Sequence, residues 1–309
     1  MSARARAGRA AWRTVRVEAR AKVNLGLAVG PRRPDGYHEL ATIFQTVSLA
    51  DQLTFRPLRS GFTLQVRSDS RQVGAVPRGR ANLVLRAAHL MRENFVIGGA
   101  AIRLDKRIPA ASGLGGASAD AAGTLLGLAR LYGLRPPMAR LLELAVRLGA
   151  DVPFAVLGGT ALGLGRGERL EPLRLQRPFR AVIAVPHWRI STALAFRRID
   201  AGKYGLTAWG AKLRFAQALG RDEVTALIGR RLGNTFELAL GNRKRHLASL
   251  LERMSAAGLQ DSRMTGSGSA AFGILPAGRS AKIVLSRFVG DERLYVVRSA
   301  SPGSRIAVS

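Results

Sequence analysis

Arg107-Ile-Pro-Ala-Ala-Ser-Gly-Leu-Gly-Gly-Ala-Ser-Ala-Asp-Ala-Ala122 joins the end of a predicted strand to a glycine-rich loop and the start of a predicted helix. Glycines allow positive φ angles and close approach of the backbone, so several N–H groups of such a loop can point at one anion. The N-terminus of the helix adds about half a positive charge. The loop therefore predicts a phosphate site. It matches neither G-x-x-x-x-G-K-[ST] nor G-x-G-x-x-G, because Ser118 stands where the last glycine would be, which disfavours Walker-type and Rossmann loops.

Hydrophobic periodicity on both sides of this loop predicts a mixture of strands and helices. The strands expected in this half of the chain cover residues 15–29, 62–66 and 101–104. The helices expected here cover residues 82–94, 117–132 and 138–148. The helix at 117–132 has small side chains on one side and leucines on the other, which indicates close packing against a sheet. After Gly149 we expect residues 150–154 to form a loop.

A domain boundary is expected near residues 170–178, because new strand and helix patterns begin after it. These patterns are a strand at 181–185, a glycine loop at 265–268, a strand at 270–275, a helix at 281–288 and an edge strand at 294–298. The chain is thus predicted to contain a basic, disordered extension (1–13), a first domain (14–170) and a second domain (171–300).

The composition predicts a folded protein with a strongly basic surface. The chain has 309 residues, of which 47% are hydrophobic, and this length corresponds to about two domains. Lysine and arginine total 49 against 20 aspartates and glutamates, a formal net charge of +29. Such a charge suits an anionic partner, either a phosphorylated substrate or a nucleic acid. The arginines are spread along the whole chain, and alanine and glycine are abundant, which favours compositional drift as the main origin of the charge.

Several classes of protein are excluded by residues that the chain lacks. With no cysteine it has no disulfide framework, thiolate nucleophile, iron–sulfur site or cysteine–zinc site. The four histidines lie far apart and have no carboxylate cluster around them, so no transition-metal centre is expected. The arginine-rich start lacks the apolar core of a signal peptide, and no long apolar run follows. We expect a cytoplasmic protein; an organelle transit peptide is the alternative interpretation of the start.

The order of residues in Pro109-x-x-x-Gly-Leu-Gly-Gly-x-Ser118 resembles the phosphate loop of the GHMP kinases, a superfamily of small-molecule kinases. Met264-Thr-Gly-Ser-Gly-Ser269 looks like another motif of that superfamily. The remaining matching segments look like one branch, the 4-diphosphocytidyl-2-C-methyl-D-erythritol kinases of the non-mevalonate isoprenoid pathway. They are Ala21-Lys-Val-Asn-Leu25, Arg33-Pro-Asp-Gly-Tyr-His-Glu-Leu40, Gly149-Ala-Asp-Val-Pro-Phe154 and Gly158-Gly-Thr-Ala-Leu162.

This resemblance implies a two-domain α+β protein with the GHMP kinase fold. The first domain would be like the second domain of ribosomal protein S5, and the smaller second domain would be ferredoxin-like, with the active site in the cleft between them. The implied reaction is in-line transfer of a phosphoryl group from ATP to the 2-hydroxyl group of 4-diphosphocytidyl-2-C-methyl-D-erythritol, with no covalent enzyme intermediate.

Phosphoryl transfer to an alcohol needs a cradle for the polyphosphate, cations at the transferred group and a carboxylate that accepts the hydroxyl proton. By resemblance, Asp151 is this base. Lys22 is its neighbour, which keeps the carboxylate ionised and offsets charge on the transferred group. Taken alone, Asp151 also fits a turn or helix-terminal aspartate and Lys22 an exposed strand lysine. Their place in two matching motifs favours the catalytic roles.

The same resemblance implies a set of residues around ATP. They are Asn82, Leu83, Pro109, Gly113, Leu114, Gly115, Gly116, Ala117 and Ser118. Asn82 and Leu83 would lie beside adenine, although Asn82 is equally suited to capping the helix. The Ser118 hydroxyl would lie near the β-phosphate or its Mg²⁺, an ion held mainly by phosphates and water because no carboxylate cage is evident. Asp120 is expected to interact with the helix dipole rather than to be a second catalytic acid.

For the acceptor, Tyr37 and His38 resemble the pair that stacks on and hydrogen-bonds the cytosine, with Phe196 as a partner across the ring. Asn24 would orient the erythritol hydroxyls. The residues implied to lie along the phosphates of substrate and product are Thr192, Thr265, Gly266 and Ser267. Tyr37 and His38 also fit a surface turn, because Pro34-Asp-Gly36 is a strong turn signal, and both interpretations can hold.

Two segments depart from the pattern of this branch. Ala117 and Ala119 stand where a glycine and a hydroxyl residue are usual, and an alanine leaves its amide free as long as its φ is negative. Asn234-Thr-Phe-Glu237 stands where Asn-Asp-Leu-Glu is common, and we interpret this segment as domain packing.

Two other functions stay open. The chain fits a kinase for a different small alcohol, although the Tyr37-His38 pair argues against it. It also fits an RNA-binding protein, although only 6% of its residues are aromatic and it has no recognised RNA motif. The partner we expect is a small cytidine diphosphate derivative, with no specific nucleic acid and no membrane. The chain is expected to be a monomer or a weak homodimer.

Overall fold

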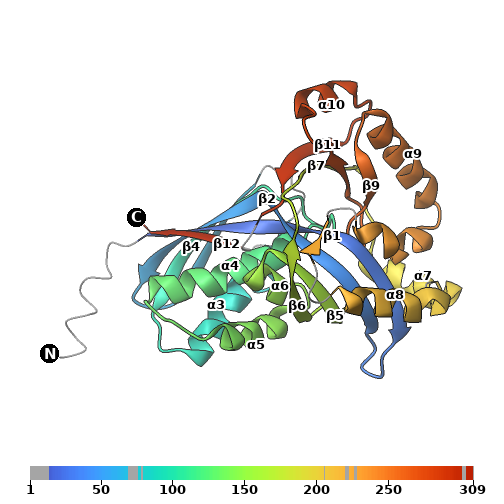
Figure 1. The fold of residues 1–309 in the computed structure, drawn as a ribbon. Coiled ribbons are helices and arrows are strands. Elements are labelled where there is room, and N and C mark those ends of the chain that lie inside the picture. The colour runs from blue at the N-terminus through green and yellow to red at the C-terminus, as the bar shows by residue number, and fades with distance from the viewer. Residues whose placement is uncertain are drawn as a thin grey trace.

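The computed structural model describes residues 14–68, 76–77, 79–204, 206–219, 223–225, 228–300 and 304–308. The predicted basic extension, residues 1–13, lies outside the described residues. The described part of the chain contains an eight-stranded sheet and a four-stranded sheet, each with helices packed on it (Figure 1).

A long antiparallel hairpin, β1 (Val15–Arg32) and β2 (His38–Leu58), forms the centre of the first sheet. The strand order is β12-β1-β2-β5-β6-β8, and β4 pairs with both β2 and β3. The other strands of this sheet are β3 (Phe62–Ser68), β4 (Gly99–Lys106), β5 (Thr160–Gly165), β6 (Arg169–Leu175), β8 (Glu223–Val224) and β12 (Ser304–Val308). The alternation predicted for β1 holds only up to Ala19, after which the strand is buried on both faces as far as Gly30.

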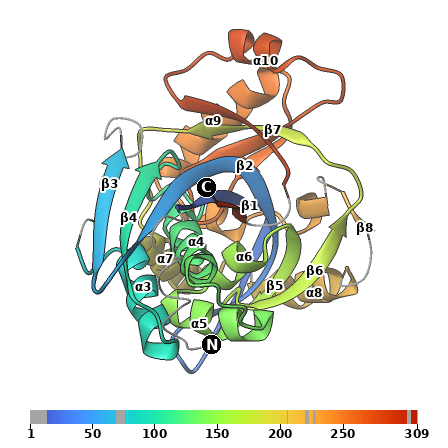
Figure 2. The same ribbon diagram turned by 90° about the vertical axis from the view of Figure 1, so that its left-hand side faces the viewer.

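Four helices cover one face of this sheet, and α4 lies against β1 and β2 (Figure 2). They are α3 (Leu83–Asn94), α4 (Gly116–Leu131), α5 (Met138–Leu148) and α6 (Val152–Leu157). Two glycines of α4 allow its close approach, since a Cβ at Gly127 would lie 2.4 Å from the Phe55 ring and one at Gly123 would lie 2.7 Å from Leu53. The structure thus confirms the predicted close packing of this helix.

The second sheet has the antiparallel order β11-β7-β10-β9. Its strands are β7 (Arg180–Val185), β9 (Gln260–Met264), β10 (Ala271–Leu275) and β11 (Arg293–Arg298), and β11 is the predicted edge strand. The helices of this half are α7 (Thr192–Gly202), α8 (Leu206–Ala218), α9 (Arg243–Ala256) and α10 (Ala281–Arg287), with 3-10 helices η2 (Ile228–Arg231) and η3 (Thr235–Ala239).

The chain passes from the first sheet to the second between the end of β6 and the start of β7. It also returns, because β8 and β12 pair with β6 and β1 of the first sheet. The predicted boundary between the domains 14–170 and 171–300 therefore falls within β6. Strands β8 and β12, which follow this boundary in the sequence, belong to the first sheet.

The predicted loop at 150–154 is wrong in part, because α6 begins at Val152. Pro153 stands in its first turn, where the missing N–H of proline costs no helical hydrogen bond. This helix start is what places Asp151 at the edge of the site described below.

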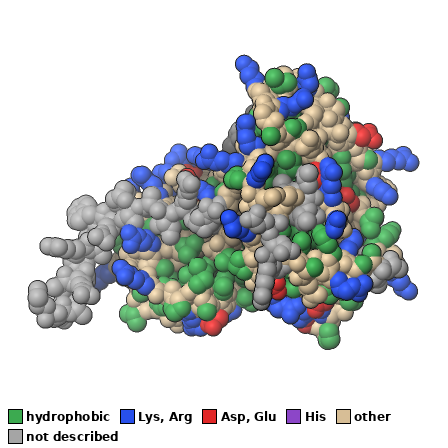
Figure 3. Space-filling view, in the orientation of Figure 1, with side chains coloured by type: hydrophobic (Ala, Val, Ile, Leu, Met, Phe, Trp, Pro, Cys, Tyr) green, Lys and Arg blue, Asp and Glu red, His purple; other side chains and the backbone are tan. Residues whose placement is uncertain are grey.

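The charge of the chain is spread over its surface. On the face drawn in Figure 3, lysine and arginine side chains are scattered over both sheets and do not gather in one stripe. Among the described residues, no helix combines the length and the apolar character that a membrane span requires.

Candidate active site

Two cavities meet at the glycine-rich loop. The hairpin cavity, of ≈ 430 Å³, is lined by residues of β1, β2 and α7 and by the residues just before α6, including Lys22 and Asp151. The loop cavity, of ≈ 260 Å³, lies between the loop and the start of α3. The residues that line both cavities are Ala111, Gly113, Gly115 and Ser118. Molecules bound in the two cavities would therefore approach each other at this loop.

The loop cavity brings together every residue that the resemblance implied for ATP. They are Asn82, Leu83, Pro109, Gly113, Leu114, Gly115, Gly116, Ala117 and Ser118. The Leu114 side chain is fully buried in the core, so this residue offers its backbone. Asn82 also caps α3, because its side chain accepts the Val84 N–H at 2.9 Å.

The loop has the backbone conformation of an anion cradle. Gly113 and Gly115 have φ of 86° and 71°, and α4 starts directly after Gly115. Ala117 lies inside the first turn of α4, where φ is negative, so its methyl group leaves the amide free. The loop and the helix N-terminus together present N–H groups toward the loop cavity.

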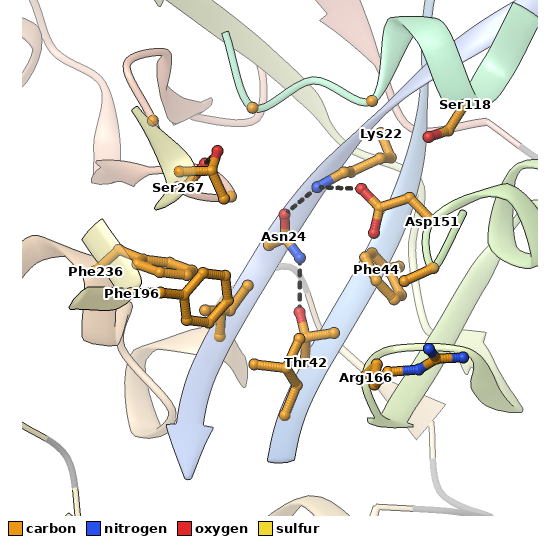
Figure 4. A pocket seen from close by; sticks show the side chains of 18 of the residues that line it. Lys22, Asn24, Thr42, Phe44, Ser118, Asp151, Arg166, Phe196, Phe236 and Ser267 are labelled. Carbon is orange, nitrogen blue, oxygen red and sulfur yellow. Dashed lines mark hydrogen bonds and ion pairs between the residues drawn. The ribbon is translucent and has the colours of Figure 1, made fainter. Parts of the chain in front are cut away.

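Lys22 and Asp151 line the hairpin cavity, and the Lys22 side chain lies against Gly115 of the shared loop (Figure 4). The Lys22 Nζ atom lies 3.4 Å from Asp151 Oδ2 and donates to Asn24 Oδ1 at 2.7 Å. Asn24 in turn donates from Nδ2 to Thr42 Oγ1 at 2.7 Å. Asp151 occupies the N-cap position of α6, but its side chain makes no capping hydrogen bond and instead faces Lys22.

The second glycine loop lies directly against the first. A Cβ at Gly113 would lie 2.4 Å from the Thr265 carbonyl oxygen, so only glycine fits there. Gly266 and Ser267 line the hairpin cavity, and the hydroxyls of Ser267 and Thr192 are 2.7 Å apart. Thr265 lies behind this surface, fully buried, and its Oγ1 accepts the Asn24 N–H at 2.8 Å.

The residues predicted for the cytosine lie at the far end of the hairpin cavity. Phe196 stacks on His38 with ring centroids 4.9 Å apart and planes 20° apart. No base fits between these two rings, so one face of the Phe196 ring is already covered by His38. Tyr37 is 56% exposed, and the Arg166 guanidinium lies 4.9 Å from its ring centroid. His38 Nε2 lies 2.7 Å from Asp200 Oδ1, which ties β2 to α7.

Several residues of the hairpin cavity were absent from the sequence prediction. They are Leu27, Leu40, Thr42, Phe44, Ala111, Ala150, Arg166, Ile190 and Phe236, of which Figure 4 labels Thr42, Phe44, Arg166 and Phe236. Thr42 and Phe44 are two residues apart on β2, so their side chains lie on the same face of the strand. If this strand had been predicted, the spacing would have placed both residues beside each other.

The segment interpreted as domain packing does contact the first sheet, because Thr235 Oγ1 accepts the Val29 N–H of β1 at 3.1 Å, and it also supports the second glycine loop. Asn234 Nδ2 donates to the carbonyl oxygens of Met264 and Gly266 at 3.0 Å and 2.9 Å. Glu237 Oε1 accepts the Met264 N–H at 2.9 Å.

Asp120 does not have the predicted role at the helix terminus. Its side chain is buried and forms an ion pair with Lys106 at 2.7 Å. Within the described part of the chain, no three His, Cys, Asp or Glu side chains come together in a way that could hold a metal ion.

Comparisons with known proteins agree with this geometry. Residues 82–159, which include the glycine-rich loop and Asp151, match the GHMP kinases N terminal domain. A homoserine kinase from Cytophaga hutchinsonii is 18% identical and has a TM-score of 0.71, over 95% of this chain and 97% of that chain. This likeness shows that the fold is that of the GHMP kinases.

Two relatives are much more similar in sequence. A 4-diphosphocytidyl-2-C-methyl-D-erythritol kinase from Pelotomaculum thermopropionicum is 40% identical over 287 residues, which are 92% of this chain and 97% of that protein. A crystal structure of 4-(cytidine 5'-diphospho)-2C-methyl-D-erythritol kinase is 39% identical and has a TM-score of 0.72, over 93% of this chain and 100% of that chain. The chain therefore belongs to the 4-diphosphocytidyl-2-C-methyl-D-erythritol kinase family within the GHMP kinases.

Proposed function

We propose that this chain transfers the γ-phosphoryl group of ATP to the 2-hydroxyl group of 4-diphosphocytidyl-2-C-methyl-D-erythritol, a step of the non-mevalonate isoprenoid pathway. The observation that carries this proposal is the meeting of two cavities at one phosphate loop, with the ion pair of Lys22 and Asp151 in the hairpin cavity beside that loop. One cavity has the backbone N–H groups for a polyphosphate, and the other has the polar and aromatic side chains for a nucleotide-bearing alcohol.

The loop cavity would hold ATP. Its phosphates would accept hydrogen bonds from the backbone of residues 113–118, and adenine would lie beside Asn82 and Leu83. Mg²⁺ would be held by the phosphates and water, with the Ser118 hydroxyl nearby, and would neutralise charge on the phosphates. Among the residues that line the loop cavity, the side chains that carry oxygen, the ligand atom that Mg²⁺ prefers, are those of Asn82, Ser112, Ser118 and Asp120.

The hairpin cavity would hold the alcohol. Asp151 accepts the proton of the attacking hydroxyl, and Asn24 orients that group. Lys22 keeps the carboxylate ionised and stabilises negative charge on the transferred phosphoryl group. Tyr37 and His38 would bind the cytosine. The diphosphate would lie along Thr192 and the loop 265–267.

Phe196 acts on the cytosine through His38, because the two rings are already stacked. We also propose that the first sheet with α3–α6 corresponds to a domain like the second domain of ribosomal protein S5, and the second sheet to a ferredoxin-like domain. The enzyme would act as a monomer or weak homodimer, without a specific nucleic acid or a membrane as partner.

ADP release by the purified chain tests the proposal. The assay contains ATP, Mg²⁺ and 4-diphosphocytidyl-2-C-methyl-D-erythritol, with mevalonate, homoserine and galactose as control acceptors. We expect turnover with the cytidyl acceptor alone. Turnover with one of the controls instead, or none with any acceptor from folded protein that binds ATP, would contradict the proposed acceptor.

A further inference from the structure

A buried cluster of three charged side chains lies directly beneath the phosphate loop. Its members are Asp51 on β2, Lys106 at the end of β4 and Asp120 in α4, which are 0%, 8% and 3% exposed. Lys106 Nζ donates to Asp51 Oδ2 and, at 2.7 Å, to Asp120 Oδ2. The proposed phosphoryl transfer gives no role to any of the three.

Asp51 holds the residues that lead into the loop. Its Oδ1 atom accepts the backbone N–H groups of Arg107 at 2.6 Å and Ile108 at 2.9 Å, while Oδ2 accepts Lys106. Both oxygens of the Asp51 carboxylate thus accept hydrogen bonds. Two of the donors are main-chain N–H groups at the point where β4 leads into the loop. The position of this turn depends on the carboxylate.

Lys106 and Asp120 hold the other end of the loop. A Cβ at Gly116, the first residue of α4, would lie 3.3 Å from Lys106 Nζ, so the ammonium lies against the helix start. Asp120 follows one turn later on the same helix and binds the same ammonium. Lys106 and Asp120 also line the loop cavity. One lysine thus connects both ends of the loop to the sheet and the helix.

Stability alone does not explain a buried cluster of this kind. Removal of charges from water is costly, and apolar side chains of similar volume often give equal or greater stability. Burial raises the pKa of Asp120 well above its usual range, although Lys106 opposes this effect. Burial alone would lower the pKa of Lys106, but Asp120 and Asp51 outweigh it and raise that pKa. What apolar residues cannot supply is the directed hydrogen bonding that orients the loop.

We propose that Asp51, Lys106 and Asp120 are positioning residues that hold both ends of the phosphate loop in the geometry that binds the nucleotide phosphates. This inference rests on the proposed function only in taking ATP as the nucleotide of the loop cavity. It assigns the cluster an effect on nucleotide affinity beyond its effect on folding.

The test measures the Kd of ATP for the full chain by titration calorimetry without acceptor, at a temperature where each variant is folded. Both carboxylate oxygens of Asp51 accept hydrogen bonds. In Asp51→Asn one of them is replaced by an N–H₂ group, which faces a donor whichever way the amide is turned. We therefore expect ATP to bind about tenfold more weakly. Asp120→Ala leaves Lys106 without one acceptor, and a similar weakening of about tenfold is expected. Asp120→Asn keeps an acceptor for Lys106 and should change the Kd less than about threefold.

Asp105→Asn is the matched control. Asp105 precedes Lys106 on β4, and its carboxylate pairs with Arg103 at 2.9 Å, away from the loop. We expect its Kd for ATP to equal that of the parent chain. In steady-state assays, Asp51→Asn and Asp120→Ala should raise the KM for ATP and leave the KM for the acceptor unchanged.

Variants that lower the Tm but bind ATP as tightly as the parent would overturn the proposal, because the cluster would then be structural only. If Asp51→Asn does not fold, the two variants of Asp120 decide. A higher Kd for ATP in Asp120→Ala together with a nearly unchanged Kd in Asp120→Asn supports positioning. Equal Kd values in the two variants refute it. A parent chain that binds no ATP would contradict the proposed function instead, so the two failures are distinguishable.

Discussion

The ammonium of Lys22 lies 3.4 Å from the carboxylate of Asp151 and 2.7 Å from the side-chain oxygen of Asn24. The lysine thus connects the proposed base to the residue proposed to orient the hydroxyl group. The Lys22 side chain is 9% exposed and that of Asp151 is 36% exposed. A substrate in the hairpin cavity can therefore reach the carboxylate, while the lysine stays behind it as a fixed positive charge.

Asp151→Asn removes the proton acceptor and keeps the shape of the side chain. We expect kcat to fall by about 10²–10⁴-fold, the usual contribution of a general base, while the Kd of ATP is retained. Single-turnover rates and ATP titration measure the two effects. The control is Glu143→Gln, an exposed residue of α5 whose carboxylate pairs with Arg140. Unchanged turnover in Asp151→Asn would rule out its role as base.

Lys22→Met keeps the length of the side chain and removes its charge. Because this charge faces Asp151 and the alkyl chain that carries it lies against Gly115 of the phosphate loop, we expect kcat to fall by about 10²–10³-fold at saturating substrates. Lys282→Met, on the exposed face of α10, is the matched control and should have no effect. A change confined to the KM for ATP would mean that Lys22 binds nucleotide but does not stabilise the transferred group.

Gly113→Ala tests the contact between the two glycine loops. The new methyl group would lie 2.4 Å from the Thr265 carbonyl oxygen, on a residue with φ of 86°. We expect a lower Tm and loss of measurable ATP binding, since the loop has to move. The control is Gly133→Ala, where φ is 65° but no atom lies within 4 Å of the added Cβ. That variant should lose only about 1 kcal/mol of stability and keep full ATP affinity. Equal behaviour of the two variants would show that the loops do not depend on this contact.

Phe196→Ala tests whether the stacked pair of Phe196 and His38 serves the acceptor. Loss of the stack frees the His38 ring, so we expect the KM for the cytidyl acceptor to rise by about 5–100-fold, as for the loss of one aromatic stack. The KM for ATP should stay within a factor of about two. Tyr204→Ala, at the end of the same helix region, is the control. An increase of both KM values together would indicate general loss of structure instead.

The local features of the fold were predictable from the sequence, because glycines, prolines and apolar spacing act over a few residues. The helix predicted at 138–148 matches α5, and the predicted glycine loop does lead into α4. The residues implied for ATP line one cavity, since most of them lie in that one loop. Strand β2 was not predicted, because residues 41–47 are buried on both faces and only residues 51–56 alternate between buried and less buried positions.

Contacts between distant segments could not be predicted. Asp51 meets Lys106 because β2 pairs with β4 in a register that places Gln52 opposite Asp105. No pattern in either strand sets that register. The stacking of Phe196 on His38 likewise depends on how α7 packs against the start of β2, so no local pattern predicts it.

The pH dependence of folding tests the role of Glu237 in supporting the second glycine loop. Burial raises the pKa of Glu237 above its ordinary 4.5, although the Met264 N–H and Arg263 partly oppose the shift. In the folded chain the Glu237 carboxyl group therefore stays protonated at pH values at which it is ionised in the unfolded chain. The contribution of Glu237 to the free energy of unfolding is fully present below pH 4.5 and declines as the pH rises through the folded-state pKa.

Glu237→Gln cannot titrate, and its side-chain oxygen still accepts the Met264 N–H. Relative to the parent, we expect this variant to gain stability as the pH rises from 4.5 toward neutrality in urea unfolding. A difference from the parent that is independent of pH would mean that Glu237 does not titrate in the folded chain in this range.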